Sequence, residues 1–150
     1  MHMNSATIYE TCRRAAGMTQ ERAAELLGVA VRTLAAWENG ERIPPDVRVA
    51  AMVDLYGTPV LAIQHLRLRS VIARETLPAV EAVPLPQAVC RFCSAVRDIS
   101  RMDAEGRLMR IAADGKVDEL EQEEFGELLA ALDPIVEEAL ALRCAREGQP

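Results

Sequence analysis

Residues 19–45 read TQERAAELLGVAVRTLAAWENGERIPP and describe two short helices that meet at a glycine. Thr19 is a good first cap, because its hydroxyl can accept a backbone N–H. Gly28 ends the first helix, since glycine enters the left-handed conformation at little cost. Asn39-Gly40 closes the second helix. On the buried side of the pair we expect Ala23, Ala24, Leu26, Leu27, Val29, Leu34 and Trp37.

This run resembles the helix-turn-helix of the Cro and cI repressors, known as the XRE family. In that family a Gln opens the first (scaffold) helix, Leu-Gly marks the turn, and Trp-Glu-x-Gly ends the second (recognition) helix. The matching positions here are Gln20, Leu27-Gly28, Trp37-Glu38 and Gly40. The resemblance covers residues 1–57 and implies the Cro-like fold; the alternative is a small helical bundle of another kind. It also implies a structural ion pair between Arg13 and Glu38.

The resemblance further implies DNA binding by a recognition helix in the major groove. By position it assigns phosphate contact to Gln20, base reading to Val31, Arg32, Thr33 and Ala36, and contact with the adjoining backbone to Asn39 and Arg42. Ala30 departs from the Ser or Thr that is usual there. Val31 and Ala36 offer only apolar contact, for instance to a thymine methyl. We therefore expect Arg32 to be the main polar reader, suited to guanine.

Composition predicts an all-α protein. Half of the 150 residues are hydrophobic and 3% are aromatic, which is typical of helices packed through Ala, Leu and Val. The net charge of −6 is unusual for a DNA-binding protein, since phosphate contacts need Lys and Arg. Residues 1–57 carry six basic and seven acidic side chains, a balance of −1; residues 58–150 carry 11 and 16, a balance of −5. The acidity therefore belongs mostly to the second part.

Capping signals and apolar spacing predict three more helices in the first part. Thr7-x-x-Glu10 is a capping box for a helix over about 8–16, and Asp46 can start a helix that ends at Gly57. Thr58-Pro59 predicts a fifth helix from Val60 to about Arg74, with Thr58 as its cap. Apolar residues from Leu61 to Ile72 nearly encircle that helix. We expect them to form a dimer interface, with packing against the second part of the chain as the competing interpretation.

Three prolines in residues 76–87 predict an extended connector between a DNA-binding domain (1–75) and a second domain (88–150). We expect a helix over about 88–113, loosened near Gly106, then a turn at Asp114-Gly115. Asp118-x-x-Glu121 is a capping box for a last helix, which Pro134 either kinks or divides in two. These segments predict a helical hairpin that makes or reinforces a homodimer.

Other motifs favour structure over chemistry. Cys90-x-x-Cys93 has the spacing of zinc ligands, but no second pair accompanies it, so we expect both thiols in the core. The turn at Asp114 resembles part of a calcium loop whose first ligands are missing. The acidic run 119–127 is typical of a solvated helix face. No catalytic constellation stands out, and no metal or cofactor is expected.

The sequence thus favours a cytoplasmic transcriptional regulator that binds double-stranded DNA as a homodimer and makes no membrane contact. A signal peptide and a long apolar run are not seen, and we expect the four cysteines to form no disulfides. The alternative is a protein-interaction module, such as an antitoxin or accessory subunit, that keeps the helix-turn-helix fold. Val31, Ala35 and Ala36 favour that alternative, whereas Gln20, Arg32 and Arg42 favour DNA.

Overall fold

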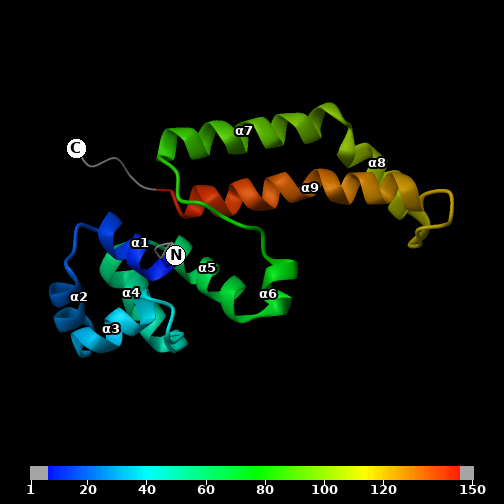
Figure 1. Ribbon diagram of the computed structural model, residues 1–150. Helices are drawn as coiled ribbons and strands as arrows, with labels where there is room; N and C mark the ends of the chain where they lie inside the picture. The colour runs from blue at the N-terminus through cyan, green and yellow to red at the C-terminus, as the bar shows by residue number, and fades with distance from the viewer. Residues whose placement is uncertain (1–6, 146–150) are drawn as a thin grey trace, which may run out of the picture. The chain divides into compact units, whose positions relative to one another are not determined.

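The computed structural model describes residues 7–145, and within that range its regular elements are helices, with no strands. The all-α prediction is therefore confirmed. The chain divides into two compact units, Met1–Ala79 and Val80–Pro150. The helices (Figure 1) are α1 (Ile8–Ala15), α2 (Gln20–Leu27), α3 (Val31–Glu38), α4 (Asp46–Tyr56), α5 (Val60–Arg69), α6 (Val71–Thr76), α7 (Leu85–Arg101), α8 (Ala104–Ile111), the 3-10 turn η1 (Ala112–Asp114) and α9 (Gln122–Arg143).

Local capping fixes the helix ends of the first unit. Thr7 accepts a hydrogen bond from the backbone N–H of Glu10, and Thr19 accepts one from that of Arg22. Gly28 ends α2 at φ +64°, a left-handed conformation in which a Cβ would be strained. These predicted caps are confirmed, and the left-handed Gly28 sets the direction in which the chain leaves α2 toward α3.

One apolar cluster holds α1–α5 together. Leu34, Met52 and Leu61 are fully buried, and each such side chain contributes roughly 1.5–3 kcal/mol. The other buried members are Tyr9, Cys12, Ala23, Ala24, Leu27, Trp37, Val49 and Tyr56. The burial predicted for Leu26 is wrong, because this side chain is 47% exposed. The small side chains of Ala23 and Ala24 bring α2 close to the core, so Leu26 is left on its rim.

The predicted fifth helix is interrupted at Ser70. This residue is extended, and its hydroxyl accepts from the N–H of Ala73, so α6 starts as a separate helix. Arg67 stabilises the corner by donating to the carbonyls of Arg74 and Leu77. The cap predicted for Thr58 is also wrong, since its hydroxyl donates to the carbonyl of Tyr56.

The second unit is a helical hairpin, as predicted. In Figure 1, α7 and α9 lie side by side and run in opposite directions, and α8 connects them near the start of α9. Arg91 joins the two long helices by donating from Nε to Oε1 of Glu138 at 2.9 Å. Helix α7 starts at Leu85 instead of the predicted 88, because Pro86 stands in the first turn, where its missing N–H costs little.

The predicted loosening near Gly106 lies instead at Met102-Asp103. Asp103 is left-handed, with φ +51°, and separates α7 from α8. Gly106 belongs to α8, where an added Cβ would lie 2.9 Å from Oδ2 of Asp103. The glycine therefore makes room for the carboxylate of the break.

The predicted turn and capping box before α9 are both present. The N–H of Lys116 donates to Asp114, and the Asp118 and Glu121 carboxylates each accept the other residue's N–H. Pro134 lies inside one continuous α9, which settles the choice between one helix and two.

Most of the acidic run is engaged in local pairs. Glu124 accepts from Arg107 and Arg110 at 2.7 Å, and these contacts lower the pKa of its carboxyl, with the Arg107 hydrogen bond as the main cause. Glu127 lies 3.5 Å from Arg107, and Glu121 belongs to the capping box.

Candidate nucleic-acid interface

The turn between α2 and α3 is held from two sides. Gly28 supplies the left-handed corner, and the N–H of Val29 bonds to the carbonyl of Ala24. Arg48 of α4 donates from Nη1 to the carbonyl of Leu27 at 3.0 Å, so a cation satisfies the C-terminal end of α2. The angle between the two helices is therefore set by backbone geometry and one long side chain.

The Arg13–Glu38 pair implied by the resemblance is present and buried. Nε and Nη2 of Arg13 donate to the two carboxylate oxygens of Glu38, at 2.6 and 2.9 Å. The third contact of Arg13, from Nη1, reaches the carbonyl of Met18 at 2.6 Å. The hydrogen bond to Glu38 is the main cause that raises the pKa of Arg13. This bidentate geometry fastens the end of α3 to α1.

Two further groups converge on the end of α3. The hydroxyl of Thr7 donates to the carbonyl of Glu38 at 2.8 Å, which ties the start of α1 to the end of the recognition helix. Burial is the main cause that raises the pKa of Tyr56 to about 12, and the nearby Glu38 carboxylate adds to it. The phenol therefore stays protonated throughout the physiological range.

Gln20 belongs to this network as well. Its Nε2 donates to Oε2 of Glu38 at 2.8 Å, and the side chain is half-buried. The amide thus orients the first residue of α2 against the last residue of α3. The backbone N–H groups at the start of α2 remain the feature suited to a phosphate.

The predicted reading residues share the side of α3 that faces away from the core. Val31 is 40% exposed, and Arg32 is also exposed. Asn39 and Arg42, which were expected to contact the adjoining backbone, follow α3 and are exposed as well. Thr33 and Ala36, with the neighbouring Ala35, are half-buried. Leu34 and Trp37 occupy the opposite side and are buried. The sequence therefore separated the two sides of this helix correctly.

The arginines near α3 differ in whether they form ion pairs. Arg14 pairs with Glu10 and Arg22 pairs with Glu25, so both cations are locally balanced. Arg32 and Arg42, by contrast, make no ion pair with any residue between 7 and 145. Two unbalanced guanidinium groups flank an otherwise small and apolar surface.

Sequence reasoning missed a polar network at the start of α4. His65 is buried at 2% exposure, and its Nε2 lies 3.0 Å from Oδ1 of Asp46. Because a carboxylate only accepts, Nε2 carries a hydrogen toward Asp46, and Nδ1 on the other side of the ring is hydrogen-bonded to the Tyr9 hydroxyl at 2.8 Å. A single histidine in the apolar run of α5 was the signal that could have revealed it.

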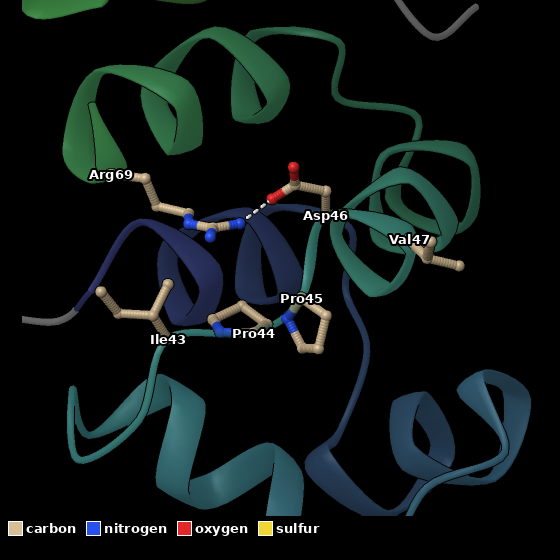
Figure 2. A pocket seen from close by; sticks show the side chains of 6 residues that line it. All are labelled: Ile43, Pro44, Pro45, Asp46, Val47 and Arg69. Carbon is tan, nitrogen blue, oxygen red and sulfur yellow. Dashed lines mark hydrogen bonds and ion pairs between the residues drawn. The ribbon is translucent and has the colours of Figure 1, made fainter.

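Arg69 completes this network at the surface. Figure 2 shows its guanidinium reaching Asp46 above the two prolines of a shallow hollow of about 500 Å³. The hollow is lined by Ile43, Pro44, Pro45, Asp46, Val47 and Arg69. The ion pair occupies the polar groups of the hollow, so the arrangement fixes the loop after α3 and offers little to a ligand.

The lowered pKa of the Asp46 carboxyl lets us predict how the free energy of unfolding depends on pH. The His65 hydrogen bond is the main cause that lowers the pKa of Asp46 below its ordinary 3.8, and Arg69 adds to it. Its contribution is therefore complete above about pH 4 and is lost as pH falls through the lowered pKa. When the pH is lowered from 5 to 2, we expect the free energy of unfolding to fall less in Asp46→Asn than in the parent chain. Urea unfolding at both pH values tests this, and an equal loss in the two proteins would contradict it.

The paired cysteines, and the question of metal and membrane binding, are the remaining points raised by the sequence. Cys90 and Cys93 are exposed, so the predicted core packing is wrong. They lie two and five residues after the buried Ala88, about 200° and 140° round the helix, and so turn away from α9. Between residues 7 and 145, no three His, Cys, Asp or Glu side chains gather in a way that could hold a metal ion. In the same range no helix combines the length and apolarity needed to cross a bilayer.

Comparison with known proteins matches the part of the chain just described. Residues 10–66 match a family model described as a helix-turn-helix domain. Searches of curated proteins and of solved structures found no match. The matched range begins inside α1, ends inside α5 and contains the whole α2–turn–α3 arrangement. Residues 10–66 therefore form a helix-turn-helix domain.

Proposed function

We propose that this protein is a transcriptional regulator that binds double-stranded DNA in a sequence-specific manner as a homodimer. The observation that carries the proposal is the exposed side of α3 and the loop after it, where Arg32 and Arg42 have no acidic partner among residues 7–145. Helix-turn-helix domains place such a side in the major groove.

The proposed roles follow from position and chemistry. Arg32 reads a base edge, since its planar guanidinium can bond both acceptors of a guanine. Val31, Thr33 and Ala36 form a low surface that lets α3 approach the bases closely. Gln20, Asn39 and Arg42 flank that surface and contact the phosphate backbone.

Charge makes the dimer important for this function. The first unit, residues 1–79, carries nine basic and eight acidic side chains, a balance of +1. A single unit of that charge has few phosphate contacts and binds weakly. Two linked units double those contacts and match half-sites about 34 Å apart.

The salt dependence of binding tests the proposal. Fragments enriched by genomic pull-down are measured by fluorescence anisotropy between 50 and 200 mM salt. We expect the logarithm of the affinity to fall linearly with the logarithm of the salt concentration, with a slope near −0.9 for each phosphate neutralised. Scrambled fragments serve as the control for specificity.

The protein-interaction alternative has its own support in the exposed Val31 beside the half-buried Ala35 and Ala36. It predicts no enrichment of DNA and a salt slope near zero. A flat salt response on every fragment, together with equal affinity for scrambled DNA, would therefore reject the proposed function and favour that alternative.

A further inference from the structure

The hairpin of the second unit has an apolar face that its own helices do not cover. Ala88 is the only residue of α7 that is buried, and α9 buries Leu128 and Ala141. Apolar side chains beside these positions are 39–50% exposed; they are Leu85, Val89, Val96, Leu129 and Val136. Together they present on the order of 400 Å² of apolar surface, which is the size of the largest apolar patch on a typical monomer, and such a patch is often functional.

Helix geometry places these side chains on one side of the hairpin. Val89 and Val96 follow the buried Ala88 by one and eight residues, which puts both about 80–100° round α7. Leu129 and Val136 follow the buried Leu128 by the same intervals on α9. The two helices run in opposite directions (Figure 1). An equal rotation about each helix axis, starting from the side that faces the other helix, therefore ends on the same face of the hairpin.

The outer edges of this face carry opposite charges. Arg97 lies about 180° from Ala88 on α7, and Asp133 lies about 140° from Leu128 on α9, so each borders the face on its far side. Both are exposed, and neither makes an ion pair within residues 7–145. They stand on opposite edges of the hairpin and so are not placed to pair within one chain.

The two charges are also level with each other along the helices. Arg91 and Glu138 meet across the hairpin, with Nε and Oε1 2.9 Å apart. One step forward on α7 corresponds to one step back on α9. Arg97, six residues after Arg91, therefore lies level with residue 132, next to Asp133.

We propose that a second copy of this chain covers the face, forming a four-helix bundle in which α7 of each copy lies over α9 of the other. A twofold axis parallel to the helices gives this pairing. Rotation about that axis does not change a residue's position along the helices, so residues at the same height in the two copies lie next to each other. Arg97 of each copy then faces Asp133 of the other, and Val96 packs near Val136. The proposal rests on the homodimer of the proposed function and assigns its interface.

Sedimentation equilibrium of the full chain tests the interface. The parent chain is expected to be a dimer. Val96→Asp places a charge at the centre of the face in both copies, and we expect the dimer Kd to rise at least about a hundredfold. Ile72→Asp is the matched control: it is 73% exposed, lies in α6 and should leave the Kd unchanged. Helical circular dichroism confirms that both variants fold.

Charge reversal tests the predicted pairing itself. Arg97→Glu and Asp133→Arg should each raise the dimer Kd about tenfold, since each brings like charges together twice in the symmetric dimer. The double variant restores opposite charges and should return the Kd to near the parent value. An additive loss in the double variant would overturn the pairing of α7 with α9.

The outcomes separate the interface from the function. A monomeric parent chain, or a Val96→Asp variant that stays dimeric, would overturn the interface, as would dissociation by Ile72→Asp alone. A dimer that Val96→Asp dissociates but that shows no salt-dependent DNA binding would uphold the interface and reject the proposed function.

Discussion

Glu38→Ala is expected to destabilise the helix-turn-helix domain by about 3–5 kcal/mol, because it leaves the Arg13 guanidinium buried without its counter-charge. Arg13 is 6% exposed and would retain only its bond to the Met18 carbonyl. Gln20 would lose its acceptor at the same time. Urea unfolding followed by the fluorescence of Trp37, the single tryptophan of the chain, reports on this domain directly.

Two comparison variants make the result interpretable. Glu25→Ala removes an exposed carboxylate from its pair with Arg22 and should change stability by no more than about 1 kcal/mol. Arg13→Met combined with Glu38→Leu removes both charges and should recover most of the loss. If Glu38→Ala cost no more than Glu25→Ala, the pair would contribute little to the position of α3.

The second large effect concerns DNA reading. Arg32→Ala is expected to reduce the preference for the cognate fragment over a scrambled one by roughly 1–3 kcal/mol, the value of a bidentate contact with guanine. Competition gel shifts at fixed salt measure the ratio of the two affinities. The effect should appear mainly as lost discrimination, since Val31 and Ala36 offer only apolar contact.

Arg42→Ala is the matched control, because it removes an equally unbalanced cation from the flank of the reading surface. It should weaken binding to all fragments by a similar factor and reduce the salt slope by about one. An unchanged affinity ratio in Arg32→Ala would mean that this side chain reads no base. Loss of discrimination in Arg42→Ala alone would reverse the two assigned roles.

Features that depend on a few neighbouring residues could be read from the sequence. Thr7, Thr19 and Gly28 act on backbone groups within four residues, and the structure has each one as predicted. The two sides of α3 were also separable, because Leu34 and Trp37 share one phase of the helix. The assignment of DNA contacts to single residues stays a prediction.

Features that depend on distant packing were predicted less well. Ser70 looked like one polar residue in an apolar helix, yet Arg67 stabilises a corner there by reaching residues 74 and 77. Cys90 and Cys93 were predicted to be buried because the sequence of one helix does not show how much of its surface the neighbouring helix covers. The partners of His65 stand 56 and 19 residues away, so no local pattern contained them.

Pro134 has a consequence for the shape that α9 can adopt. Its ring leaves the carbonyl of Ala130 without the usual amide donor, and both residues are exposed, so solvent can hydrate that oxygen. A proline ring pushes a helix away from the side that carries it. Here that side faces away from α7, so we expect the proline ring to favour bending of α9 toward α7, which keeps the two helices in contact, whereas a proline facing α7 would favour their separation.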